Sequence, residues 1–108
     1  MFKLVQGKTG KFHFTLQARN RQVILTSQAY HTRAAARGGI ASVKKNAPDD
    51  ARYERKTAAN GKFHFNLKAG NSQIIGSSQM YADEAGRENG IASVKTNAPD
   101  ATIEDETA

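Results

Sequence analysis

Cysteine is absent from this 108-residue sequence, and aromatic residues make up only 7% of it. The lack of cysteine excludes disulfides, thiolate nucleophiles and zinc-thiolate sites, and it fits a reducing compartment. No stretch approaches the roughly 20 apolar residues that cross a membrane, and the first residues lack the apolar run of a signal peptide. We therefore expect a cytoplasmic protein with no membrane anchor.

The main feature of the sequence is an internal repeat. Residues 10–49 recur at residues 61–100 with a constant shift of 51 and no gap, and 24 of the 40 aligned positions are identical. A unit of about 50 residues can rarely close its own core, so we expect the two copies to share one. The prediction is a single domain, 1–108, with repeat one at about 1–56 and repeat two at about 57–108. Such a chain is expected to be a monomer with internal pseudo-twofold symmetry.

The clearest strand signal lies at Lys11–Gln17, where Phe12, Phe14 and Leu16 point to one side and polar residues to the other. This alternation predicts a strand with one buried face, and the repeat predicts its equivalent 51 residues later. Further strands are expected at Phe2–Gln6, Gln22–Ser27, Tyr53–Thr57, Gln73–Ser78 and Glu104–Ala108.

Ala18–Arg21 is expected to be a hairpin turn, with Asn20 able to take a left-handed backbone conformation. Its counterpart, Ala69–Ser72, has the same turn character. In the return strands, Leu25 of the first copy is replaced by Gly76 in the second. A glycine inside a strand indicates a sheet edge or a close approach of another group.

Two helices are expected to begin after Thr32 and Asp83, because both residue types are favourable N-caps. Gly39 and Gly90 fall inside these helices, where glycine costs about 1 kcal/mol relative to alanine, so a close contact is expected at each. Prolines at 48 and 99 should end the helices. Apolar residues at helical spacing predict the buried stripe: Ala36, Ile40, Val43 and Ala47, with Ile91, Val94 and Ala98 in the second copy.

The runs FNLKAGN at 65–71, QIIGSSQMY at 73–81 and the repeated GIASVK resemble the YegP-like family of small bacterial tandem-repeat proteins of uncharacterised function. The junction ARYERKTAANGKFHF at 51–65 adds to the resemblance, which covers nearly the whole chain. It implies an α+β fold: two tandem β-β-β-α-β repeats that form one antiparallel sheet with two helices and exchange their C-terminal strands. The family supplies no catalytic or ligand residues. This chain departs from the family's usual Asn-Gly turn, having Asn20-Arg21.

The charge is unevenly distributed along the chain. The net charge is +6, with +9 in residues 1–56 and −3 in residues 57–108. Lys11, His13, Arg19 and Arg21 form the candidate surface for an anionic partner such as a nucleic-acid backbone. Because the phenylalanines are expected to face the core, stacking platforms for single-stranded nucleic acid are missing.

The sequence contains no recognisable catalytic arrangement. His13 and His64 recur in the two copies, but no metal-ligand spacing surrounds them, and the serines lie outside any nucleophile motif. Gly38-Gly39 lies inside a helical pattern and lacks the other residues of a phosphate loop. We therefore expect no enzyme, no cofactor and no metal. The prediction is a small binding or scaffold module, with weak, sequence-independent nucleic-acid binding through the first repeat as the alternative.

Overall fold

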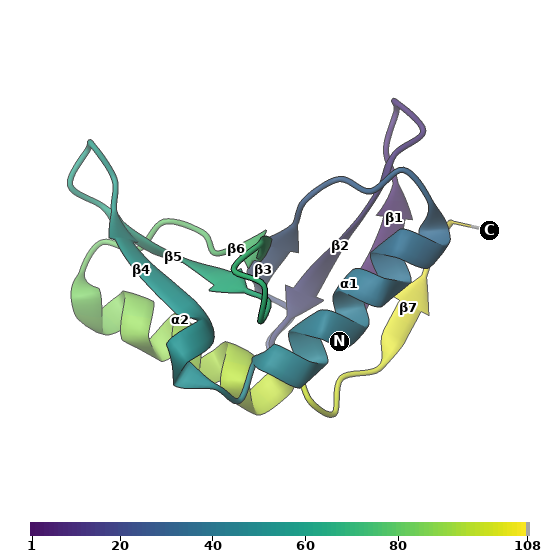
Figure 1. Ribbon diagram of the computed structural model, residues 1–108. Coiled ribbons are helices and arrows are strands. Elements are labelled where there is room, and N and C mark those ends of the chain that lie inside the picture. Colours follow the sequence, from purple (N-terminus) through teal and green to yellow (C-terminus); the bar gives the residue numbers. More distant parts are fainter. Residues whose placement is uncertain (108) are drawn as a thin grey trace.

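The structure is a computed structural model, and it describes residues 1–107. Seven strands and two helices follow the order β-β-β-α-β-β-β-α-β, with a short 3-10 turn before the fourth strand (Figure 1). The strand expected at 104–108 is found slightly earlier, and Ala108 lies outside the described residues. The elements are β1 (Phe2–Gln6), β2 (Phe12–Gln17), β3 (Val23–Ser27), α1 (Arg33–Asn46), β4 (Tyr53–Thr57), β5 (Phe63–Lys68), β6 (Ile74–Ser77), α2 (Glu84–Asn97) and β7 (Ile103–Asp105).

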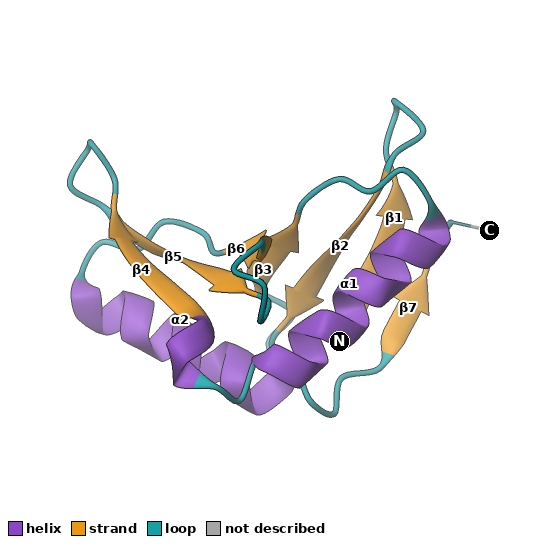
Figure 2. Ribbon diagram, in the orientation of Figure 1, coloured by secondary structure: helices purple, strands orange, loops and turns teal. Residues whose placement is uncertain are grey.

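All seven strands belong to one sheet in the order β4-β5-β6-β3-β2-β1-β7. Both helices cover the same side of this sheet (Figure 2). The turns of the β1–β2 and β4–β5 hairpins project away from the helices, at the top of the view. One buried cluster between the helices and the sheet takes side chains from both repeats. Its largest fully buried members are Phe2, Leu4, Phe14, Leu16, Leu25, Ile40, Phe65, Leu67 and Ile91.

The C-terminal strand of each repeat pairs with the other repeat. β4 follows α1 but pairs with β5, and β7 follows α2 but pairs with β1. The strand exchange implied by the family resemblance is therefore present. One pairing differs from the expected antiparallel sheet, because β7 runs parallel to β1, with Phe2 N donating to Thr102 O at 2.7 Å. The three antiparallel pairings between β1 and β6 make β6 run opposite to β1. Helix α2 then leads the chain back against the direction of β6, so β7 reaches the outer edge of β1 in the same direction as β1.

The two halves of the sheet meet where β3 pairs with β6 through Thr26–Ser77 and Ser27–Gly76. Thr26 and Ser77 are equivalent residues of the two repeats, so the pseudo-twofold axis passes through this pair. Beside it, a Cβ placed on Gly76 would lie 2.9 Å from Leu25 Cγ. Gly76 is thus at the centre of the sheet, and of the two expected explanations for this glycine, the close approach is the right one.

The helices begin and pack as the sequence predicts. Thr32 Oγ1 accepts from Ala35 N at 3.0 Å, and Asp83 Oδ1 accepts from Gly86 N at 2.7 Å. The apolar stripes of both helices are buried. The group packed against Gly39 is the hydroxyl end of Tyr30, and the repeat places Tyr81 on Gly90 in the same way.

The β2–β3 turn corrects one expectation. Asn20 does not take the left-handed conformation; Arg21 does, with a φ of 66°, and Ser72 has a φ of 69° in the second copy. Arg21 N donates to Ala18 O, and Asn20 Oδ1 accepts from Gln22 N at 3.0 Å. The asparagine therefore stabilises the turn through its side chain, and the next residue carries the positive φ. The β1–β2 turn places Gly10 at the corresponding point, with a φ of 82°.

The close approach at the junction predicts strong coupling between Leu25 and Gly76. Leu25→Gly should lower the free energy of unfolding by roughly 3–5 kcal/mol because it opens a cavity, and Gly76→Leu should lower it by ~1–3 kcal/mol or more through overpacking. In the double variant the leucine at 76 can occupy the space left at 25. Urea denaturation should therefore give a combined loss at least ~1 kcal/mol smaller than the sum of the two. Pairing Gly76→Leu with Leu4→Ala is the control, and an additive result for both pairs would contradict the packing described.

A second prediction concerns the strained turn. Arg21→Gly should raise the free energy of unfolding by roughly 0.5–1 kcal/mol. A residue with a side chain costs ~1–2 kcal/mol at positive φ, and glycine removes that strain. The greater conformational entropy of glycine in the unfolded chain offsets part of the gain. Thermal unfolding of Arg21→Gly and Arg21→Ala would separate this effect from loss of the arginine. Equal stability of the two variants would show that the backbone at this position is not strained.

Candidate anionic-partner surface

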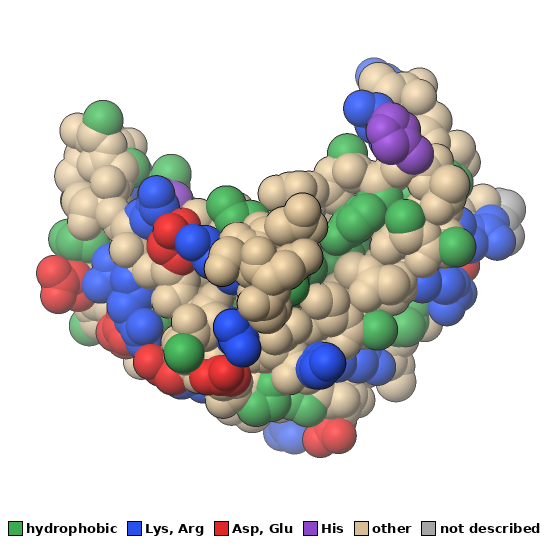
Figure 3. Space-filling view, viewed as in Figure 1, with side chains coloured by type: hydrophobic (Ala, Val, Ile, Leu, Met, Phe, Trp, Pro, Cys, Tyr) green, Lys and Arg blue, Asp and Glu red, His purple; other side chains and the backbone are tan. Residues whose placement is uncertain are grey.

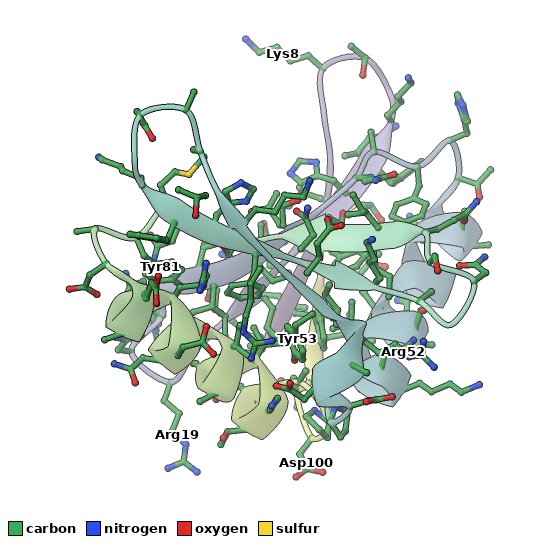
Figure 4. All side chains as sticks on the ribbon, turned by 60° about the vertical axis from the view of Figure 1, so that its left-hand side comes forward. Lys8, Arg19, Arg52, Tyr53, Tyr81 and Asp100 are labelled. Atoms are coloured by element: carbon green, nitrogen blue, oxygen red, sulfur yellow. The ribbon has the colours of Figure 1, made fainter. Side chains whose placement is uncertain are left out.

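The structure does not bring the four candidate residues together. Lys11 directly precedes β2 and His13 lies on it, whereas Arg19 and Arg21 occupy the turn that follows its other end. Eight residues of extended chain separate Lys11 from Arg19 by roughly 25 Å. Figure 4 shows Arg19 pointing away from the molecule at the end opposite the β1–β2 turn, where Lys8 lies. The candidate set is therefore two separate groups.

Three basic residues of the first repeat pair with acidic residues in and directly after the C-terminal strand. Arg37 Nη2 lies 2.9 Å from Asp105 Oδ2, Arg33 Nε lies 3.8 Å from the same oxygen, and Lys3 faces Glu106. Thr107 and Arg37 bond the Asp105 carboxylate and lower its pKa to about 2. Since β7 carries acidic residues onto the basic half, the two halves of the sequence are not two oppositely charged halves of the molecule.

A second group of ion pairs surrounds the opposite end of the sheet. Arg55 Nη2 lies 3.0 Å from Asp50 Oδ1 and 2.9 Å from Glu88 Oε1, and Lys95 Nζ lies 2.7 Å from Asp50. The hydrogen bonds from Lys95 and Arg55 lower the pKa of Asp50 to about 2. Figure 3 shows acidic and basic side chains interleaved on this part of the surface, at the left of the view. No single sign of charge dominates this end.

Seven of the sixteen lysines and arginines have no acidic partner in the described residues. Within residues 1–107 the lysines and arginines that form no ion pair are Lys8, Lys11, Arg19, Arg21, Lys44, Lys45 and Lys62. Lys11, Arg19 and Arg21 belong to this group, and His13 also forms no ion pair in the described residues. The sequence did not predict which cations remain unpaired, because that depends on the pairing of β7 with β1.

Arg19 and Arg21 each line a groove, and Met1 lies between the two. Arg21, Lys3 and Gln17 line a groove of about 500 Å³ beside β7. Arg19 lines a groove of about 300 Å³ together with Thr96 and Asp100 at the end of α2. Each groove also holds one carboxylate, from Glu104 in the first and Asp100 in the second. An anionic group in either groove would meet a guanidinium, which suits bidentate recognition of a carboxylate or phosphate.

The remaining reactive side chains are engaged elsewhere. Ser27 Oγ accepts from Phe14 N and donates to Gln28 O, and Ser78 Oγ makes the equivalent bonds in the second copy. In the described part of the chain no three His, Cys, Asp or Glu side chains come together as metal ligands do. The same residues include no helix with the length and hydropathy needed to cross a membrane.

Comparison with known proteins decides the family. The sequence profile described as "Domain of unknown function (DUF1508)" matches residues 8–54 and again residues 58–105, which together are most of the chain. The chain belongs to the DUF1508 family. Two DUF1508 matches in tandem agree with the repeat seen in the sequence, and the predicted relation to YegP-like proteins is confirmed.

Curated members of the DUF1508 family resemble the chain along its whole length. The UPF0339 protein YegP of Shigella flexneri is 56% identical over 106 residues, which cover 98% of this chain and 96% of the relative. The UPF0339 protein PA0329 of Pseudomonas aeruginosa is 50% identical over 105 residues, covering 97% and 96%. Neither name assigns an activity.

Solved structures show the same fold. The solution structure of YegP from Escherichia coli, titled a protein of unknown function, matches with a TM-score of 0.94 at 54% identity, over 99% of this chain and 92% of that one. The solution structure of the UPF0339 protein SO3888 from Shewanella oneidensis matches with a TM-score of 0.93 at 48% identity, over 98% and 90%. The predicted α+β fold is confirmed.

The lowered pKa of Asp105 predicts how β7 responds to acid. A carboxyl whose folded pKa is below its unfolded value stabilises the fold above pH ~4, and the effect is lost as the pH falls toward about 2. Asp105→Asn should therefore be less stable than the wild type at pH 7 and should lose less stability between pH 4 and pH 2. Hydrogen exchange of the Phe2 and Glu106 amides, which bond across β1 and β7, would report the loosening directly.

Glu104→Gln is the matched control for this change. Glu104 lies on the same strand, is exposed and has no ion-pair partner in residues 1–107. It should leave both the stability and the amide exchange unchanged. An equal acid response of Asp105→Asn and the wild type would show that Asp105 contributes nothing to holding β7.

Proposed function

We propose that the protein is a non-enzymatic binding module that holds an anionic partner at the end of the sheet formed by the β2–β3 turn. The observation that carries this proposal is that Arg19 and Arg21 have no acidic partner in the described residues, although most arginines of the chain do. Each also stands at the rim of a groove. A guanidinium that is not neutralised by its own chain is available to a carboxylate or phosphate.

The non-enzymatic part of the proposal rests on the surroundings of the nucleophiles. Ser27 and Ser78 hydroxyls are used to bond the backbone of β2 and β5. His13 and His64 sit on strands in opposite halves of the sheet order, so they do not pair with each other. A binding role needs neither a base nor a nucleophile. We place the module in the cytoplasm as a monomer, since it has no cysteine and its two repeats share one core.

Nucleic acid is the alternative partner, and one observation favours it. Lys8 and Lys11 lie at the β1–β2 turn and Lys62 at the β4–β5 turn, and these hairpins rise on the same side of the molecule (Figure 1). All three lysines are free of ion pairs in the described residues. Phe14 and Phe65 are fully buried, so base stacking on them is excluded and any contact would be made to phosphates. Binding of that kind would be independent of sequence.

Fluorescence anisotropy separates these possibilities. The probes are a labelled poly-glutamate peptide and labelled single-stranded and duplex RNA and DNA, each at low and physiological salt. Arg19→Glu with Arg21→Glu should weaken binding of the acidic probe by roughly tenfold or more, because two attractive contacts become repulsive. The matched control, Lys8→Glu with Lys62→Glu, changes the net charge equally at the hairpin tips. It should leave the peptide affinity within about twofold.

The pattern of losses decides the outcome. Equal weakening by the two double variants would show that net charge alone attracts the probe and would overturn the proposed site. Stronger weakening at the hairpin tips, seen with nucleic acid that still binds at physiological salt, would make nucleic acid the partner. No binding of any probe at low salt would exclude both.

A further inference from the structure

A groove on the helix side of the sheet is separate from the sites considered above. It lies between the β2–β3 turn and α2, has a volume of about 300 Å³, and is lined by ten residues. Its base consists of alanine, isoleucine and two glycines. Its polar side chains are Asn20, Gln22, Gln79, Tyr81, Asn89 and Ser93.

None of the ten lining residues is charged, although 24% of the chain is. The grooves beside Arg19 and Arg21 both contain charged side chains. A charge-free groove selects against ions, because an ion would lose hydration without gaining a counter-charge. Its ligand must therefore be neutral and able to exchange hydrogen bonds with amides.

Three of the amides in this groove are free to bond a ligand. The side chains of Gln22, Gln79 and Asn89 are exposed, and in residues 1–107 they make no hydrogen bond to the protein. Two other polar side chains already form hydrogen bonds within the protein. Asn20 Oδ1 accepts from Gln22 N, and Ser93 Oγ accepts from Asn97 Nδ2. Each free amide offers both a donor and an acceptor.

The internal repeat retains most of this lining, whereas only two of the seven residues lining the groove beside Arg19, Asn97 and Asp100, are identical to their counterparts. Eight of the ten positions are identical at the shift of 51; the exceptions are Gly86 and Asn89, which are replaced by Ala35 and Gly38. None of the six residues lining the groove beside Arg21 is identical to its counterpart. Asn20 and Ser93 are retained in hydrogen bonds within the protein. Tyr81 and Gly90 are retained in mutual packing. The fold does not account for the exposed glutamines at 22 and 79, which recur at 73 and 28.

We propose that this groove binds a short, uncharged, extended peptide segment of a partner protein. A peptide group presents one N–H and one C=O, which match the donor and acceptor of a glutamine or asparagine amide. A sugar is the less suitable ligand, because one face of the Tyr81 ring is already stacked on Phe65 and its hydroxyl end packs on Gly90. The volume fits about two or three residues of small side chain.

The test is a titration followed by the side-chain amide resonances of ¹⁵N-labelled protein. The probe is a pool of tetrapeptides, acetylated and amidated at their ends and composed of Ala, Ser, Val and Leu, added to millimolar concentration. The side-chain NH₂ signals of Gln22, Gln79 and Asn89 should shift together. Gln22→Ala with Gln79→Ala should raise the apparent dissociation constant roughly tenfold, because two neutral hydrogen-bonding groups are lost. Both residues are exposed, so the fold should persist.

Controls make the outcome specific. Gln17→Ala removes an amide outside the groove and should not change the response, and a pool with Glu or Lys at the two central positions should bind more weakly. Arg19→Glu with Arg21→Glu should leave the neutral pool's binding intact, so failure of the anionic site and failure of this groove are distinguishable. The proposal is overturned if the neutral pool shifts none of the three amides, if the glutamine double variant responds like the wild type, or if maltotriose shifts them and the peptides do not.

Discussion

The fold depends on the constraint that two equivalent side chains cannot occupy the same space beside a twofold axis. Only two residue pairs join β3 to β6, and there the Leu25 side chain fills the volume that its counterpart at 76 would need. A glycine at one of the two positions resolves the conflict. The seven-stranded sheet is continuous because the repeats differ here, and a perfectly symmetric tandem copy with leucine at both positions would be overpacked.

The same asymmetry extends from packing to charge. The repeats share their core and their turns, so the backbone is nearly twofold, yet the exposed residues of the two copies have diverged. The acidic C-terminal strand returns to the basic repeat, and its carboxylates neutralise Arg33, Arg37 and Lys3. What remains unpaired in the described residues are cations at the hairpin turns, together with Lys44 and Lys45 at the end of α1. The surface available to an anionic partner is therefore smaller than the net charge suggests.

Local features of the fold were predictable because each depends on neighbouring residues. The alternation at Lys11–Gln17 and the caps at Thr32 and Asp83 involve neighbours in sequence, and the structure has them. The parallel direction of β7 was not predicted, since it depends on where a helical crossover returns the chain. In the β2–β3 turn, the residue preferences favoured Asn20 for the positive φ, but the hydrogen bond from Gln22 N fixes Asn20 and moves that φ to Arg21.

The candidate surface was only partly accessible to sequence reasoning. Arg19 and Arg21 could be proposed from their charge, whereas the separation of Lys11 and His13 from them requires the length and direction of β2. The uncharged groove involves the β2–β3 turn of one repeat and the helix of the other. The residues from the turn and strand lie 55 to 75 positions before those from the second repeat, and no local pattern relates them.

The charges of the two helices also determine which sheet edge the chain end recognises. At the positions of Arg33 and Arg37 in α1, helix α2 carries Glu84 and Glu88, and Lys3 of β1 corresponds to Glu54 of β4. A β7 strand that approached the β4 edge of a second molecule would bring Asp105 to these glutamates. Such a contact would place like charges together, which disfavours linking of two molecules through these sheet edges.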